Sequence, residues 1–338
     1  MFEDQERDIA SIELSRWGRV VRVDGIIGWL VVDPDGVAVE PIRRFLRDFV
    51  ARDNRAGSVR SYAYVLLRWW RWLQAVGVQW DKATPSEARD LVLWLRQASK
   101  RSNSPRTASA ATVGTVNPVT HKRHLSDGYE PRTIRHNNAV VRSFYEFWID
   151  LGEGPLINPV RLDRGQRARP NAHHNPLERF RPEGRIRYNP KLPKAAPRAM
   201  PDERWQDLFD GLQSNRDRGL LAIAVSNGAR AGELLGMRSV DVDWGDQLIR
   251  VRRKGSGAAQ WLPASSDAFV WLRLYLDDLG DPLQPNDPLW QTLRRQDHGD
   301  GPRRQPMTYE ALRAVFRRVN ALLGSNWSMH DLRHNFSA

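Results

Sequence analysis

The chain has 338 residues, enough for two domains of ordinary size, and its hydrophobic share of 41% and charged share of 27% are typical of a soluble globular protein. Its 52 Lys and Arg exceed its 40 Asp and Glu, and the net charge of +12 favours a polyanionic partner, nucleic acid before membrane. The chain contains no Cys, which excludes disulfides, thiol nucleophiles and Cys-ligated zinc.

The sequence shows no targeting or membrane segment. The first eight residues are acidic and unlike a signal peptide. The longest uncharged apolar run, residues 219–229, is far shorter than the roughly 20 residues that a membrane span requires. We therefore expect a cytoplasmic protein with no membrane partner.

Residues 1–40 are expected to form an N-terminal extension. Within it, residues 30–39 have two β-branched arms around Pro34-Asp35-Gly36, which is a turn signature. This pattern predicts a small β-hairpin. The sequence indicates no function for the extension.

Residues 41–155 have helical periodicity and predict a compact helical domain. The segments 58–76 and 133–151 each place apolar side chains on one stripe, which should face the core, and arginines on another. The polar stretch 100–129 between them is expected to be a loop. Most of the 14 tryptophans of the chain should pack in cores, with base stacking as the alternative for any one of them. The candidate DNA-binding residues of this domain are Arg60, Arg68, Arg71, Arg135 and Arg142.

A basic, proline-rich linker is expected at residues 156–198. Between residues 161 and 200, eleven Lys or Arg and three acids give a local charge of +8, and six prolines forbid long helices. The segment is either a solvated connection or a strap along a phosphate backbone, and the two interpretations are compatible.

The last segment, residues 199–338, predicts a second domain that mixes helices with a β-hairpin. A short helix at residues 229–237 places Arg230 and Glu233 on one face, at a spacing that is usually an ordinary surface ion pair. Lys254 ends the first strand of the predicted hairpin, just before a Gly-Ser-Gly turn. Taken alone, it would be an ordinary edge-strand lysine.

The final motif runs from Ser328 to His334. Ser328 and Asp331 have the spacing of a helix N-cap pair, so a helix should begin here. His330, Arg333 and His334 then project from one face of its first turns. Two imidazoles and a guanidinium beside the N–H groups of a helix start suit an anion, most simply a phosphate.

Two other interpretations of this motif remain open. The first is a surface cap with a satisfied histidine. The second is a metal site, because His330 and His334 have the spacing of the zinc-protease helix. In that motif a Glu follows the first His, whereas here Asp331 does, and Arg333 would put a positive charge beside the cation. We therefore expect no metal and no cofactor.

Three motifs in order, Arg-x-x-Glu-Leu from Arg230, Lys254 before a Gly-containing turn, and His-x-Leu-Arg-His from His330, resemble the tyrosine recombinase family of the phage integrase type. The resemblance covers about residues 41–338. It implies a mostly α fold with a small β-hairpin or sheet, in which a helical, SAM-like core-binding domain precedes a mixed α+β catalytic domain. It also implies site-specific cutting and rejoining of DNA through a 3′-phosphotyrosyl intermediate, in DNA integration or a related recombination of a mobile genetic element.

The resemblance also implies roles for the site residues. Arg230 and Arg333 would bind the scissile phosphate, His330 would add a hydrogen bond or a proton, and Lys254 would protonate the departing 5′ oxygen. Glu233 would orient Arg230.

The same resemblance gives His334 a supporting role in the site. It implies double-stranded DNA as the partner and self-association on DNA as a tetramer in an intact form.

One departure from the family pattern concerns the nucleophile. In the family, the nucleophilic tyrosine follows the second Arg, whereas the seven tyrosines of this chain all precede His330. Tyr309, the nearest, should begin a structural helix. We therefore expect a C-terminally truncated, incomplete catalytic domain that cannot complete cleavage. The alternative is a non-catalytic DNA-binding protein that occupies recombination sites.

Overall fold

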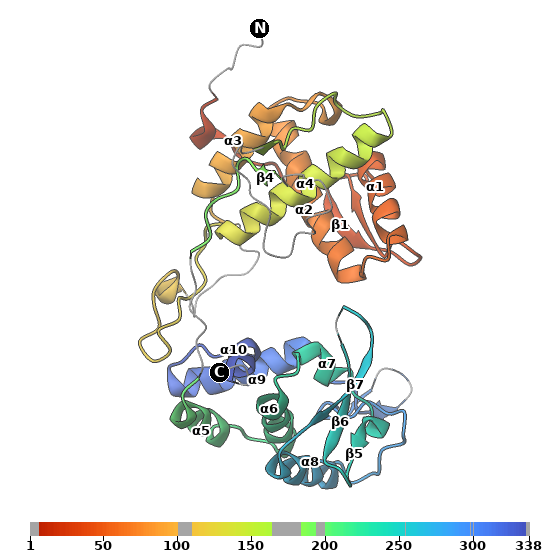
Figure 1. Cartoon of the computed structure of the whole chain (residues 1–338), viewed down its shortest axis with the longest axis vertical. Helices are drawn as coiled ribbons and strands as arrows, with labels where there is room; N and C mark the ends of the chain where they lie inside the picture. Colours follow the sequence, from red (N-terminus) through yellow and green to blue (C-terminus); the bar gives the residue numbers. More distant parts are fainter. Residues whose placement is uncertain are drawn as a thin grey trace, which may run out of the picture. The chain divides into compact units, whose positions relative to one another are not determined.

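The computed structural model divides the chain into two compact units. Unit 1 holds residues 1–108 and 126–193, and unit 2 holds residues 109–125 and 194–338. Each unit has its own hydrophobic core, and the described parts combine helices with small antiparallel sheets, as the sequence predicts (Figure 1). The described residues are 7–100, 110–163, 184–193, 200–253, 255–297, 299 and 301–335.

Unit 1 is built on long helices that pack around aromatic side chains. In the core, the indole N–H of Trp69 donates to the hydroxyl of Tyr145 at 3.0 Å, and this hydroxyl donates to the Trp80 carbonyl at 2.7 Å. Trp72 and Trp148 are also buried, which confirms core packing for these tryptophans. The helices are α1 (Glu40–Ala51), α2 (Ala56–Ala75), α3 (Pro85–Gln97) and α4 (Pro131–Asp150).

The N-terminal extension contains two adjacent antiparallel pairings. Strand β1 (Arg19–Arg22) pairs with β2 (Trp29–Val32), and β2 packs on α1 and α2. The predicted turn at residues 33–36 also forms, and the chain after it returns along β2: Val32 and Ala38 form a bridge, and the Val39 N–H donates to the Val31 carbonyl at 2.9 Å. The small hairpin predicted at residues 30–39 is therefore confirmed, whereas β1 was not predicted.

The basic linker is described only in part. Strand β3 (Leu162–Asp163) pairs with β4 (Arg185–Ile186) in unit 1. Residues 164–183 and 194–199, which contain most of the predicted strap, lie outside the described residues.

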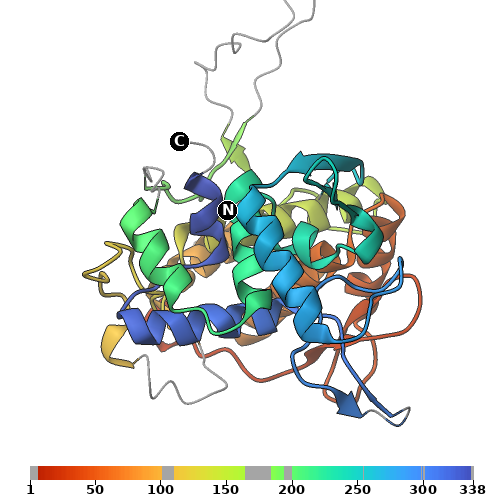
Figure 2. The same ribbon diagram turned by 90° about the horizontal axis from the view of Figure 1, so that it is seen from below.

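Unit 2 is organised around α6 (Asn215–Asn227), whose side chains are buried along most of its length. It packs against α8 (Ser266–Leu279) at close range: a Cβ added to Gly219 would lie 3.2 Å from the backbone nitrogen of Leu272. Helix α9 (Tyr309–Leu323) packs against α5 (Asp202–Asp210) (Figure 2). The further helices of this unit are α7 (Ala231–Leu235) and α10 (Met329–Asn335).

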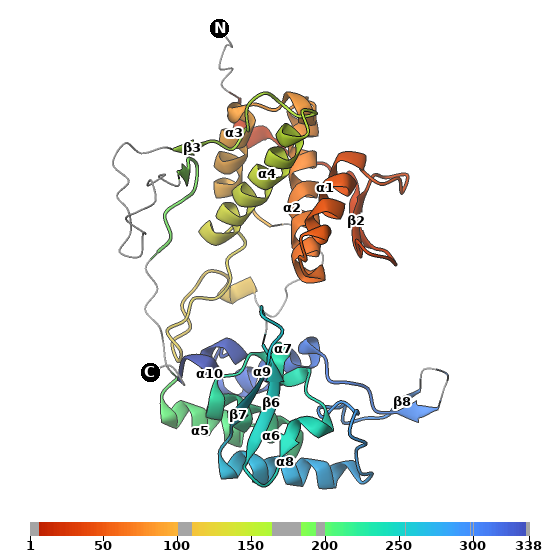
Figure 3. The same cartoon turned by 45° about the vertical axis from the view of Figure 1, so that its right-hand side comes forward.

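The sheet of unit 2 contains the predicted hairpin. Strands β6 (Leu248–Arg252) and β7 (Ala259–Pro263) pair antiparallel, and β5 (Val242–Asp243) adds a short strand beside β6. Strands β8 (Gln296–Asp297) and β9 (Pro302–Arg303) form a separate ribbon that projects from the unit (Figure 3).

Residues 110–125 form a folded loop that belongs to unit 2, although they precede α4 of unit 1 in the sequence. A bridge joins Val116 to Arg123, and the Asn117 N–H donates to the Lys122 carbonyl at 2.9 Å. The predicted loop at residues 100–129 therefore contributes to unit 2, rather than only to the helical domain predicted at residues 41–155. No helix in the described ranges is long and apolar enough to cross a membrane.

Candidate active site

Arg230 is brought into place by the end of α6. Gly228 closes that helix in the left-handed conformation, with φ of +61°, and its N–H donates to the Ala224 carbonyl at 2.9 Å. The side chain of Asn227 then accepts the Ala229 N–H at 3.0 Å. This turn leads directly into Arg230, the N-cap residue of α7.

Glu233 is a buried carboxylate that accepts hydrogen bonds from two arginines. Its side chain is only 2% exposed, and it accepts the backbone N–H of Arg230 at 3.0 Å. It also accepts Nη1 of Arg230 at 2.9 Å and Nη1 of Arg253 at 3.2 Å. The ordinary surface-pair interpretation of Arg230 and Glu233 is therefore wrong. We call Arg230, Glu233 and Arg253 the α7 arm.

The α7 arm retains a positive charge that solvent can reach. Two guanidiniums share one carboxylate, and the Arg230 side chain remains 44% exposed. A guanidinium held by a carboxylate on one side can still bind a phosphate on another, because its N–H groups form a planar fork.

The β6–β7 hairpin supplies Arg253 and leads into Lys254. Ile249 and Val251 are buried, whereas Arg250 and Arg252 lie on the opposite face of β6. Arg250 has a partner just before β5, since its Nε donates to Asp241 at 2.7 Å. Lys254 itself lies outside the described residues.

The predicted helix at Ser328 is confirmed as α10. The Ser328 N–H and hydroxyl both donate to Oδ2 of Asp331, at 2.8 and 2.6 Å, and the Asp331 N–H donates to the Ser328 carbonyl at 2.9 Å. Met329 and Leu332 are buried, which leaves His330 exposed and Arg333 half-buried. We call His330, Asp331 and Arg333 the α10 arm.

Helix α6 is the common scaffold of both arms. It leads into Arg230 at one end, and α10 packs against its body. Figures 1 and 3 show α7, α10 and the turn of the β6–β7 hairpin at the same edge of unit 2. Three separate stretches of the sequence therefore lie at this edge. The side chain of His334 lies outside the described set.

Two of the five candidate DNA-binding arginines of unit 1 donate to backbone carbonyls within the fold. Arg71 donates to the carbonyls of Trp17 and Gly18 at 2.6 and 2.7 Å. Arg142 donates to the Val160 carbonyl at 2.7 Å and pairs with Glu146 at 2.5 Å. Both arginines therefore have partners within unit 1.

The other three arginines lie on the surface of α2 and α4. Arg60 lies over the ring of Trp29 at 4.9 Å. Arg68 lies over Tyr129 at 4.9 Å and donates to Asn137 at 2.7 Å, and Arg135 is exposed on α4. We call Arg60, Arg68 and Arg135 the α2/α4 face.

Sequence reasoning missed His136, which adjoins the α2/α4 face. Its Nε2 lies 2.8 Å from the Ser61 hydroxyl. Burial and the nearby charge of Arg68 lower the pKa of His136. The signal for it was its position next to Arg135, at the start of a helix with other basic residues.

Arg253 was also missed, although the strand pattern contains a signal for it. Ile249, Val251 and Arg253 alternate, so Arg253 continues the buried face of β6. A charge on the apolar face of a strand requires a partner, and Glu233 provides it. No group of three or more His, Cys, Asp or Glu that could hold a metal occurs among the residues that the structure describes.

Two family models match this chain, one in each of its two predicted domains. Residues 200–338 match the model of the phage integrase family, and residues 42–114 match the model of the phage integrase N-terminal SAM-like domain. The chain is 24% identical over 311 residues to tyrosine recombinase XerD of Chlorobaculum tepidum, covering 88% of this chain and 83% of that protein. It is 21% identical over 319 residues to transposase A from transposon Tn554 of Staphylococcus aureus, covering 90% and 81%.

A solved structure has the same fold. The Tn1549 transposon integrase, in complex with circular intermediate DNA, aligns with a TM-score of 0.53 and 12% identity over 88% of this chain and 85% of that chain. The two family models together span more than half of the chain and include both arms of the candidate site. On these matches, the chain belongs to the phage integrase family of tyrosine recombinases.

Proposed function

We propose that this protein binds double-stranded DNA through the phosphate-binding site of a site-specific recombinase, the class of enzyme that cuts and rejoins phosphodiester bonds. The observation that carries the proposal is Arg230, whose guanidinium is fixed by a buried carboxylate and is still open to solvent. The α10 arm lies on the same edge of unit 2 (Figure 3).

The chemistry of phosphoryl transfer explains why these residue types are suitable. Negative charge develops on the non-bridging oxygens of the phosphate, and the guanidiniums of Arg230 and Arg333 would stabilise it. His330 would add a hydrogen bond or a proton to the same phosphate. Lys254 would protonate the departing 5′ oxygen as a general acid. Glu233 would hold Arg230 in orientation.

We assign DNA binding outside the reaction centre to basic surfaces of the protein. The α2/α4 face would contact the phosphate backbone, which positions a protein on DNA without reading its sequence. His334 would support the site, and the basic linker at residues 156–198 would lie along the backbone. Because the substrate would be DNA, we expect the protein to act in the cytoplasm, and to self-associate on DNA as a tetramer.

The nucleophile expected from the resemblance would follow Arg333, whereas the seven tyrosines of this sequence precede His330. Tyr275 is buried, its hydroxyl donates to the Leu289 carbonyl at 3.0 Å, and burial raises its pKa. Tyr309 is the first residue of α9, and its place there fits the structural role predicted from the sequence. We propose that this polypeptide binds DNA without forming the 3′-phosphotyrosyl bond, which is how a non-catalytic occupant of recombination sites would behave.

The test uses the purified chain and a pool of nicked duplexes that trap covalent intermediates. We expect binding that weakens with salt, by a slope of about 0.9 in log K per phosphate contact, and no covalent adduct on a denaturing gel. An adduct would overturn the claim about the nucleophile. Absence of salt-dependent binding would overturn the DNA-acting function itself.

A further inference from the structure

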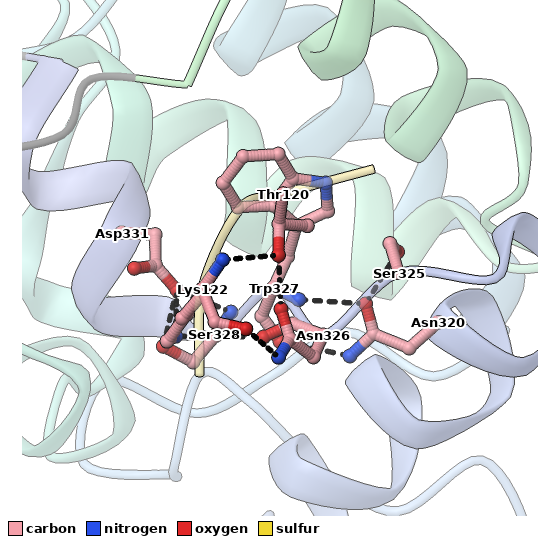
Figure 4. Close-up of polar contacts among 8 residues, drawn as sticks. All are labelled: Thr120, Lys122, Asn320, Ser325, Asn326, Trp327, Ser328 and Asp331. Carbon is pink, nitrogen blue, oxygen red and sulfur yellow. Dashed lines mark hydrogen bonds and ion pairs between the residues drawn. The ribbon is translucent and has the colours of Figure 1, made fainter. Parts of the chain in front are cut away.

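The loop at residues 110–125 docks on the segment that leads into α10 (Figure 4). Asn117 Nδ2 donates to the Gly324 carbonyl at 2.8 Å. Thr120 donates its hydroxyl to the side-chain oxygen of Asn326, and Asn326 Nδ2 donates to the Lys122 carbonyl at 3.2 Å. The segment that precedes α10 is thus hydrogen-bonded to a loop that lies some two hundred residues earlier in the sequence.

Asn320 of α9 holds the same segment through other atoms. Its Nδ2 donates to the Trp327 carbonyl at 2.8 Å, and its Oδ1 accepts the Trp327 N–H at 2.9 Å and the Ser325 hydroxyl at 2.7 Å. Loop 110–125 and α9 therefore fix the residues that immediately precede α10.

Lys122 reaches beyond this segment to the first turn of α10 (Figure 4). Its Nζ donates to Oδ2 of Asp331 at 2.6 Å and lies 3.3 Å from the Ser328 hydroxyl. The Asp331 side chain is 13% exposed and the Lys122 side chain 36%. One mostly buried carboxylate oxygen therefore accepts the two N-cap donors of Ser328 and an ammonium group.

The ammonium group of Lys122 stabilises the Asp331 carboxylate. A buried carboxylate is costly unless it is paired with a cation, and Lys122 provides that cation to the oxygen that accepts both Ser328 donors. Helix α10 has only seven residues, fewer than a helix needs to be stable by itself. Its direction therefore depends on contacts from outside, and Asp331 lies between His330 and Arg333.

We propose that Lys122 is a positioning residue for the α10 arm: it pairs with Asp331 and thereby fixes the direction in which Arg333 and His330 project. Lys122 does not touch the substrate. The inference rests on the proposed function for its consequence in DNA binding, but the contact itself can be tested without DNA. It also gives the loop between α3 and α4 a role in the candidate active site.

The experiment is a double-mutant cycle in DNA affinity, with Lys122→Ala and Arg333→Ala alone and combined. We expect Lys122→Ala to weaken binding about tenfold, which corresponds to about 1.4 kcal/mol. In the Arg333→Ala background the same change should cost clearly less, because only His330 is left to position. Lys122→Arg should retain most of the affinity.

Arg123→Ala is the matched control. Arg123 is exposed, follows Lys122 on the same loop and has the same charge. Its loss should affect affinity equally in both backgrounds. A Lys122→Ala cost that is likewise equal in both backgrounds would overturn the proposal, since it would mark Lys122 as an independent phosphate contact or as a general stabiliser.

Hydrogen exchange of the α10 amides in the DNA-free protein separates this inference from the proposed function. Exchange should be faster in Lys122→Ala than in Arg123→Ala or the unmodified chain, while exchange in α6 stays unchanged. If the chain binds no DNA, the proposed function fails and this measurement decides the inference. Equal α10 exchange in the two variants would overturn it.

Discussion

The two arms of the candidate site differ in the residue that neutralises the acid at the start of their short helix. Helices α7 and α10 are both short, with five and seven residues, and each has an acid that accepts the backbone N–H of the N-cap residue three positions earlier. In the α7 arm that acid, Glu233, is paired with the arginine proposed to bind the phosphate. In the α10 arm, Asp331 is paired with Lys122, at a separation of 209 residues.

In the α7 arm, Arg230 serves both stability and phosphate binding, whereas in the α10 arm different residues serve these two properties. Arg230 both neutralises Glu233 and presents a guanidinium to solvent, so its orientation and the stability of unit 2 depend on the same ion pair. In the α10 arm, Lys122 neutralises the acid, and Arg333 is not needed for that purpose. Stability and phosphate binding should therefore change together in the α7 arm and separately in the α10 arm.

Glu233→Ala should have the largest effect. It leaves the Arg230 N–H and two guanidiniums without their carboxylate, and removing one partner of a buried pair is strongly destabilising. Because Arg230 is 44% exposed and solvent screens it, we expect about 2–3 kcal/mol less stability in unit 2. Hydrogen exchange of the α6 amides in urea would measure this loss.

Glu233→Gln is the control for that prediction. The amide oxygen can still accept the N-cap N–H, but it cannot neutralise two guanidiniums. We expect an intermediate loss of stability together with weaker DNA binding. A Glu233→Ala variant as stable as the unmodified chain would show that the buried ion pair is not what holds the α7 arm.

Asp331→Ala should have a smaller effect, of about 1 kcal/mol, which is typical for the loss of a helix cap. Lys122 would then be an unpaired cation, but its side chain is 36% exposed and can turn to water. Asp331→Asn should keep part of the cap and lose the attraction to Lys122. Thermal unfolding of the three proteins would rank them, and a cost equal to that of Glu233→Ala would remove the distinction between the arms.

The sequence predicted those parts of the fold that depend on local patterns. The helix at α10 followed from Ser328 and Asp331, and the β6–β7 hairpin followed from alternation around the glycine turn. Periodicity also separated the buried side of α2 from its basic side. These signals lie within a few residues of each other, so no tertiary information was needed.

The contacts that were missed depend on long-range packing. Nothing near Lys122 in the sequence indicates that it pairs with Asp331, because its partner lies 209 residues further along the chain. Arg71 and Arg68 looked equivalent on one helix stripe, yet Arg71 meets the carbonyls of Trp17 and Gly18 and Arg68 does not. A charged stripe shows which side chains leave the core, but tertiary contacts decide which of them remain available to a partner.

Arg253→Met should have the smallest effect and would sharpen the comparison further. Arg253 is 27% exposed and lies 3.2 Å from Glu233, which keeps its shorter bond to Arg230. Since methionine preserves the apolar stem, we expect a stability loss below about 1 kcal/mol. DNA affinity should fall by about threefold, because the arm loses one positive charge.

The salt dependence of binding distinguishes two explanations for that fall. If Arg253 only holds Glu233 in place, the slope of log K against log salt should be the same in Arg253→Met and the unmodified chain. A slope lower by about 0.9 would mean that Arg253 itself contacts a phosphate. In that case, both guanidiniums on Glu233 would face the DNA, and the α7 arm would differ from the α10 arm in the number of phosphate contacts as well as in the identity of its counter-ion.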